Sequence, residues 1–150
     1  MRVLLATDGT GQSDAAVEAL KNLNLNDGDE IRIVSVVESL YPSVIDIYSG
    51  HLPDAKELLE KERESAVALL DAAAQKAKSF FSQGVTIDVE TLTGSPDSAI
   101  VEKAEKMDAD LIVVGSHGYR AWERLLIGSV SDSVVHHAPC SVLVVRPKKN

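Results

Sequence analysis

Five short apolar runs, separated by longer stretches with helical spacing, constrain the fold of this 150-residue chain more than any other feature. The runs are rich in valine, isoleucine and leucine, and they occupy residues 2–7, 30–38, 85–92, 109–115 and 141–147. Such residues favour strands. Two of the runs contain "LIVV" and "VLVV", which are apolar at successive positions, as is typical of strands covered on both faces. The pattern predicts a sheet buried between layers of helices.

The stretches between the runs predict helices, because their apolar residues recur every three or four positions. These stretches occupy residues 12–23, 54–82, 96–107 and 129–137. The third begins most clearly, with Ser95 as the expected N-cap and Pro96 at the first helical position. Strands and helices alternate, so we expect one α/β domain over residues 1–150, with a mainly parallel sheet and right-handed crossovers. A long loop is expected over residues 39–53, and such loops are often functional.

Composition excludes several classes of protein. The net charge of −8 disfavours general nucleic-acid binding, because the phosphate backbone would repel the chain. No apolar run approaches the length of a membrane span. Cys140 is the single cysteine and cannot form an internal disulfide, which fits a reducing compartment. The first residues, "MRVLLATDGT", lack the layout of a signal peptide. We therefore expect a cytoplasmic protein that does not contact membranes.

Two strand ends predict the position of a ligand site. In open α/β sheets, ligands bind beyond the carboxyl ends of the strands, where the strand order reverses. The first strand ends in "ATDGTGQS" and the fourth in "VVGSHG". If these two strands are neighbours, both of the following loops face one crevice.

The loop after the fourth strand has a glycine pattern that suits phosphates. Gly115 and Gly118 are followed, after nine intervening residues, by Gly128 and Ser129. Glycines allow close backbone approach and positive φ, and the free N–H groups at a helix start attract anions. A polyphosphate cradle is therefore one interpretation, with Ser129 donating to a phosphate or capping the helix. A tight turn between ordinary helix caps is the other, and the sequence leaves both open.

Three further sets of polar residues have alternative interpretations. Asp8 could bind a ribose hydroxyl or a metal ion, or could cap the helix near residues 12–13. His117 could donate to a phosphate or could lie solvated in a turn. His136 and His137 precede Cys140, but a role at the helix end is favoured over a metal site, because one cysteine is too few for structural zinc. No catalytic dyad or triad has persuasive spacing, so the site is expected to hold a ligand rather than transform it.

The spacing Gly115-x-x-Gly118, nine residues, Gly128-Ser129 resembles the ATP-binding motif of the universal stress protein family. The segments "ATDGT" and "HHAPCSVLVVRP" resemble the first and last strands of that family. The resemblance covers the whole chain in length and element order. It implies a single-domain three-layer sandwich with a five-stranded parallel sheet in the strand order 3-2-1-4-5.

The resemblance also implies a nucleotide site, a cofactor and a partner. ATP would lie across the ends of strands 1 and 4, with Mg²⁺, and AMP or ADP could take its place. Asp8 would meet the nucleoside, and Val36 or Val37 the adenine through the backbone. Ser131 stands where many members have threonine, a minor departure that keeps the hydroxyl. The full set is Thr7, Asp8, Val36, Val37, Gly115, His117, Gly118, Gly128, Ser129, Val130 and Ser131. In this strand order, residues 141–146 form an apolar edge strand, which predicts a homodimer through that strand.

Three functions remain in view at this point. The first is a nucleotide-dependent sensor or regulator of a stress response, with little intrinsic hydrolysis. The second is a phosphohydrolase or nucleotidyl transferase that uses the same site, with Asp8 holding Mg²⁺. The third is an interaction module without nucleotide, against which the glycine motif argues.

Overall fold

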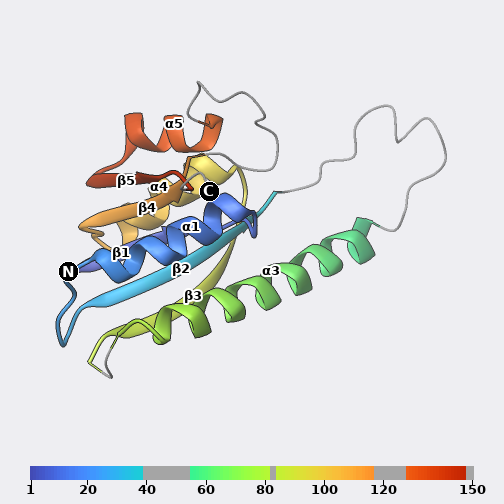
Figure 1. Cartoon of the computed structure of the whole chain (residues 1–150). Helices are drawn as coiled ribbons and strands as arrows, with labels where there is room; N and C mark the ends of the chain where they lie inside the picture. Colours follow the sequence, from blue (N-terminus) through green and yellow to red (C-terminus); the bar gives the residue numbers. More distant parts are fainter. Residues whose placement is uncertain (39–54, 82–83, 117–127, 148–150) are drawn as a thin grey trace.

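A computed structural model of the chain describes residues 1–38, 55–81, 84–116 and 128–147 (Figure 1). The strands in these ranges are β1 (Arg2–Ala6), β2 (Glu30–Val37), β3 (Thr86–Thr93), β4 (Leu111–Gly115) and β5 (Ser141–Val145). The helices are α1 (Gly11–Ala19), α3 (Ala55–Lys78), α4 (Pro96–Lys106) and α5 (Ser129–His137), and a 3-10 turn, η1 (Leu20–Asn22), follows α1. None of the described helices is long and apolar enough to cross a membrane.

The five strands form one parallel sheet in the order β3-β2-β1-β4-β5, as predicted. The strand order reverses between β1 and β4, where Val3, Leu4 and Leu5 lie opposite Leu111, Ile112 and Val113. The chain moves outward from β1 through β2 to β3 and then returns to the other side of β1. The crevice above the carboxyl ends of β1 and β4 is therefore the expected ligand position in this topology.

Helices cover both faces of the sheet and produce three layers (Figure 1). Helices α1 and α3 bury one apolar cluster against the sheet, which includes Val17, Ile33 and Leu70. Helices α4 and α5 bury the second, which includes Leu4, Ile100 and Val134. Full burial of a leucine or valine side chain contributes about 1.5–3 kcal/mol. Because both faces of β1 and β4 are covered, their side chains are apolar in succession, which explains the unbroken runs in the sequence.

Several element boundaries differ from the predicted ones. The α-helix predicted over 12–23 ends at Ala19 and tightens into η1, and the fourth strand starts at Leu111 rather than at 109. The helix predicted to reach residue 82 ends at Lys78, and Phe80 packs against the first cluster after the helix has ended.

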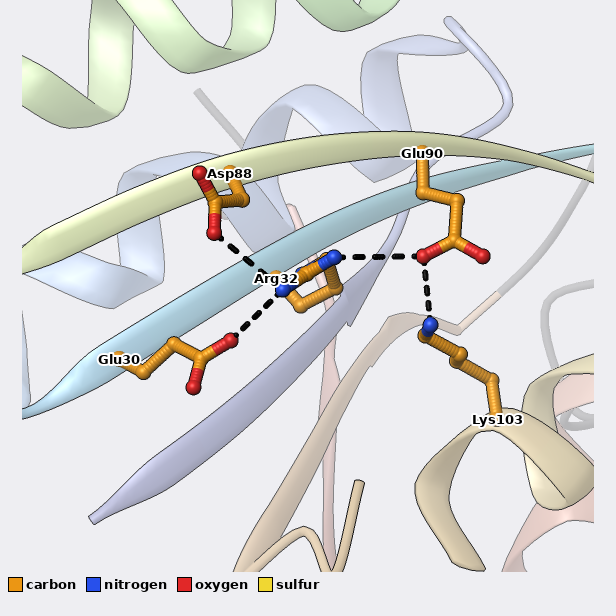
Figure 2. Close-up of polar contacts among 5 residues, drawn as sticks. All are labelled: Glu30, Arg32, Asp88, Glu90 and Lys103. Carbon is orange, nitrogen blue, oxygen red and sulfur yellow. Dashed lines mark hydrogen bonds and ion pairs between the residues drawn. The ribbon is translucent and has the colours of Figure 1, made fainter. Parts of the chain in front are cut away.

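A network of charges joins β2, β3 and α4 at the edge of the second cluster (Figure 2). The Arg32 guanidinium contacts the carboxylates of Glu30, Asp88 and Glu90 at 2.9, 3.2 and 3.4 Å. Glu90 also pairs with Lys103 of α4. The hydrogen bond to Glu30 and the surrounding carboxylates raise the pKa of Arg32, so its charge is permanent. Within the described part of the chain, the buried Nε of Arg32 has no partner.

Candidate functional site

The loop between β1 and α1 is organised by Asp8. Its Oδ1 accepts hydrogen bonds from the backbone N–H of Thr10 at 3.0 Å and from the Thr10 hydroxyl at 2.7 Å. Thr10 in turn caps α1, because its Oγ1 accepts from the Ser13 N–H at 3.4 Å. The alternative prediction that Asp8 itself caps the helix is therefore wrong. Thr10 is the N-cap, and Asp8 orients Thr10.

Gly9 in the same loop requires the conformational freedom of glycine. Its φ is +76°, in the region that L side chains rarely adopt. A Cβ placed on Gly9 would also lie 2.8 Å from Cδ1 of Leu69 in α3. The loop thus passes directly beneath α3, and this contact holds the helix against the end of β1.

The start of α5 is bonded to the end of β4. The carbonyl of Ser116 accepts from the Gly128 N–H at 2.7 Å and from the Ser131 hydroxyl at 3.3 Å. The Ser131 hydroxyl also lies 3.0 Å from the Gly128 carbonyl. These bonds place the first turn of α5 above β4, at the point where the sheet order reverses.

The conformation of this segment corrects two expectations. Gly128 has a φ of −59°, so it is not required for a left-handed turn, and Gly115 lies within β4. Ser129 begins α5 after the N-cap Gly128, which has no side chain to satisfy the first N–H groups. Ser129 is therefore not the cap, and its exposed hydroxyl and the first-turn N–H groups are positioned to meet an anion.

Ser131 has a different environment from Ser129. It is 2% exposed, and its hydroxyl proton is directed at the carbonyls described above. Its role at the start of α5 is structural in the described contacts, while its assignment as a ligand contact stays a prediction.

The end of β2 distinguishes Val36 from Val37. The Val34 carbonyl accepts from the Thr7 N–H at 2.9 Å, so even-numbered residues of β2 direct their backbone groups toward β1. The pairing of β1 with β2 ends at Ala6 and Val34, and the backbone of Val36 consequently lies beyond the end of β1. Val37 faces β3, and its carbonyl accepts from the Gly94 N–H at 3.1 Å. Val36 is therefore the residue whose backbone groups face the crevice.

A cavity of about 1080 Å³ occupies this crevice. Predicted site residues among those that line it are Thr7, Asp8, Val36, Val37, Gly115, Gly128, Ser129, Val130 and Ser131. Residues from β1, β2, β4 and α5 thus meet at one place, as expected for the carboxyl edge of a parallel sheet. The other two predicted residues, His117 and Gly118, lie outside the described residues.

Helix α3 forms a wall of the cavity that sequence reasoning missed. Lys61, Glu62 and Ser65 line the cavity together with Ala66 and Leu69. The helical stripe of α3 and its Glu57–Lys61 pair, at 3.0 Å, are both evident in the sequence. Neither pattern indicates that this face of α3 lies near the ends of β1 and β2. Its position there depends on how far the helix extends past the sheet, which the sequence pattern does not specify.

Other lining residues were also not predicted, among them Glu38, Pro96 and Ile100. Glu38 follows β2, while Pro96 and Ile100 belong to the first turns of α4. The start of α4 could have been placed near the site from the sequence, since it follows directly after the carboxyl end of β3.

The composition of the cavity suits a nucleotide. It is large enough for such a ligand, and it combines apolar side chains with the N–H groups of α5 and the carboxylate of Asp8. Among the residues that the structure describes, no three histidine, cysteine, aspartate or glutamate side chains gather as a metal site. A divalent ion in this cavity would therefore depend on phosphate oxygens as well as on Asp8.

His136 and His137 lie at the C-terminal end of α5, and Cys140 follows shortly after it. The Nδ1 atoms of His136 and His137 lie 2.8 Å from the carbonyls of Asp132 and Ser133, one helical turn earlier. This agrees with the predicted role at the helix end. Cys140 precedes β5 and is half-buried against the second cluster, and burial raises the pKa of its thiol.

The fold and site define a doubly wound α/β protein with a ligand cavity at the topological switch point. Residues 1–146 match the model of the Universal stress protein family, and the chain belongs to that family. A putative universal stress protein of Staphylococcus aureus strain USA300 is 36% identical, over 98% of this chain and 84% of the relative.

Solved structures agree with this assignment. Hypothetical protein MJ0577 superposes with a TM-score of 0.80 at 25% identity, over 99% of this chain and 97% of that one. A universal stress protein in complex with cAMP superposes with a TM-score of 0.68 at 26% identity, over 97% and 96% of the two chains.

Proposed function

We propose that this protein is an ATP-binding universal stress protein that acts as a nucleotide-dependent sensor or regulator in a stress response. The observation that carries the proposal is the cavity that brings Asp8, Gly115, Gly128 and Ser129 together at the switch point. The solved relative with cAMP supports an adenine nucleotide as the class of ligand. AMP or ADP could occupy the same cavity, because backbone N–H groups at a helix start bind a phosphate group in ligands with one, two or three phosphates.

In this proposal, each wall of the cavity contacts one part of the nucleotide. The backbone of Val36 binds the edge of the base, and Asp8 accepts from the ribose or helps to hold Mg²⁺. The N–H groups that begin α5 and the Ser129 hydroxyl bind phosphates. His117 and Gly118 stay in the proposed set from the sequence motif alone.

We propose that hydrolysis of the bound nucleotide is slow. The described cavity residues include no histidine, and their three carboxylates belong to Asp8, Glu38 and Glu62. Fast phosphoryl transfer to water needs a positioned base and stabilisation of the developing charge. We therefore propose that retention of the nucleotide, rather than turnover, is the signal.

We also propose that the protein is a cytoplasmic homodimer joined through β5. This strand lies at the edge of the sheet, and the side chains of Val142 to Val145 are half-buried within their own subunit. An apolar edge strand pairs readily with a second copy of itself, and a two-fold axis closes the assembly.

The experiment that tests nucleotide binding is mass spectrometry of small molecules released from the purified, denatured protein, followed by incubation of fresh protein with ATP and Mg²⁺. Co-purified or retained ATP supports the proposal. Rapid formation of ADP or AMP would instead identify a phosphohydrolase. Absence of any adenine nucleotide, together with no heat of binding in calorimetry, would overturn the proposal in favour of an interaction module.

A further inference from the structure

The first turns of α3 extend beyond the sheet instead of packing on it (Figure 1). The buried residues of the helix begin at Ala66 and include Leu70, Ala73 and Ala77. In contrast, every residue from 57 to 65 is exposed or half-buried. These turns therefore contribute little to the core. They line the cavity instead, through Lys61, Glu62 and Ser65.

The charges that surround the cavity are mostly negative. Asp8, Glu38 and Glu62 line it, and Lys61 is the one basic side chain among the described lining residues. The whole chain has a net charge of −8. Among the described lining residues, the three carboxylates repel a phosphate group that enters the cavity, and the ammonium of Lys61 attracts it in addition to the backbone N–H groups at the start of α5.

The present partner of Lys61 holds it weakly. Its Nζ lies 3.0 Å from Oε1 of Glu57, and the two side chains are 70% and 67% exposed. Exposed pairs at this helical spacing contribute little to stability, so the lysine can exchange Glu57 for a ligand at small cost. The flexible four-carbon stem of lysine allows this movement without a change in the helix.

Helix α3 contacts the loop that bears Asp8. Leu69, about two helical turns after Lys61, lies against Gly9, where an added Cβ would come within 2.8 Å of its Cδ1. Gly9 follows Asp8 in the chain, and residues of this loop and of α3 line the same cavity. The flexible stem of Lys61 allows its ammonium to reach ligands that differ in the number of phosphate groups.

We propose that Lys61 is a specificity-determining residue of this cavity, which leaves Glu57 to pair with nucleotide phosphates and so selects ligands by their phosphate charge. This inference rests on the proposed nucleotide binding. A triphosphate has more negative charge than a monophosphate, so Lys61 contributes more to the binding of ATP than of AMP, and nothing to the binding of adenosine.

The test is calorimetric titration of the full chain with ATP, AMP and adenosine, at fixed Mg²⁺ and low salt. Lys61→Met should weaken ATP binding about tenfold and AMP binding at most about threefold, with adenosine unchanged. Lys61→Arg should retain most of the ATP affinity. Because exposed charges are screened by ions, the difference between wild type and Lys61→Met should shrink as salt is added.

A matched control lies on the same helix. Lys78→Met removes the same charge at the last turn of α3, far along the helix from the cavity, and it should leave all three affinities within about twofold. Glu57→Gln removes the competing carboxylate and should raise the affinity for ATP. Circular dichroism and melting temperatures verify that each variant is folded.

The inference is overturned if Lys61→Met has no effect, if it weakens all three ligands equally, or if Lys78→Met has the same effect as Lys61→Met. A fall in ATP affinity in Glu57→Gln would also contradict it, because the pair would then assist binding. Failure of the proposed function is distinct: in that case the wild-type protein itself binds none of the nucleotides.

Discussion

Asp8 has two carboxylate oxygens, and the hydrogen bonds that organise its loop both go to Oδ1. Among the described contacts, Oδ2 is left for a ligand. The role of Asp8 in the loop and its role toward a ligand can be tested separately, because asparagine keeps an oxygen acceptor for Thr10 while it removes the charge. Asp8→Asn should preserve the melting temperature and lower ATP affinity at least tenfold, about 1.4 kcal/mol.

Asp8→Ala should lower both the ATP affinity and the melting temperature. About 1 kcal/mol of stability should be lost, because the Thr10 N–H and hydroxyl lose their acceptor. Calorimetry with ATP and denaturant unfolding measure the two effects. Unchanged ATP affinity in both variants would restrict Asp8 to the loop.

Gly9 provides a second prediction at the scale of single residues. Gly9→Ala should destabilise the protein by about 1–3 kcal/mol, because alanine at a φ of +76° is strained and its Cβ would collide with Leu69. Gly11→Ala is the matched control: it lies in the first turn of α1 with no atom within 4 Å of the added Cβ, so it should be neutral or slightly stabilising. Urea denaturation compares the two. Equal stabilities would show that Leu69 and the loop relax freely.

Single residues also show where sequence reasoning reached its limit at the site. Asp8 and Gly128 were identified because strand ends and glycine spacing are local signals. The difference between Val36 and Val37 depends on which neighbouring strand ends first, and that is a property of the register. Lys61 and Glu62 were missed because a helical stripe indicates which face is apolar but not how much of the helix the sheet covers.

At the scale of elements, Asp97 joins the start of α4 to the middle of α5. Its Oδ1 and Oδ2 accept from the hydroxyls of Ser95 and Ser133 at 2.6 and 2.8 Å. The sequence predicted Ser95 as an N-cap, and it occupies that position, but no capping hydrogen bond from the backbone reaches its side chain. The Ser95 hydroxyl donates to Asp97, and the charged acceptor makes this a strong hydrogen bond.

This junction predicts a pH dependence of stability. The hydrogen bonds from Ser95, from Ser133 and from backbone N–H groups lower the pKa of Asp97 in the folded protein. A lowered pKa means that the stabilisation is complete above the unfolded pKa of about 4 and is lost as the pH falls through the folded pKa.

Asp97→Asn should therefore reduce the free energy of unfolding by about 1 kcal/mol between neutral pH and about pH 5, discounted for partial exposure. The difference in the free energy of unfolding between Asp97→Asn and wild type should become smaller below about pH 4. Denaturant unfolding across this pH range measures it, with Asp132→Asn on the exposed face of α5 as a control. A difference that stays constant at acid pH would contradict the assignment.

The elements themselves were predictable because their signals are local. Strands β1 and β4 are covered on both faces, and their residues are apolar in succession after Arg2 at the start of β1. Helix α4 begins with proline. The boundaries were less predictable where tertiary contacts decide them: α1 tightens into η1 at Leu20, which is fully buried, and Phe80 continues the packing of α3 after the helix has ended. The alternation of elements predicted a parallel sheet, whereas the strand order came from the family resemblance.

At the scale of the whole molecule, the proposed dimer concerns the free edge of β5. The Val145 carbonyl accepts from the Ser116 N–H at 2.8 Å, so odd-numbered residues of β5 direct their backbone groups toward β4. Val142 and Val144 therefore direct their N–H and carbonyl groups outward, where a second β5 could pair with them. Their side chains pack against the second cluster of their own subunit.

This alternation permits a variant that blocks pairing without removing a bond within the subunit. Val144→Pro eliminates one outward N–H, and proline is tolerated on edge strands for that reason. The variant also loses the packing of the valine side chain, so Val144→Ala is its matched control: it loses most of the side chain and keeps the N–H. Sedimentation at micromolar concentration should give a dimer for the wild type and for Val144→Ala, and a folded monomer for Val144→Pro. A wild-type monomer of about 16.1 kDa would refute the dimer, and a dimeric Val144→Pro would move the interface away from the backbone of β5.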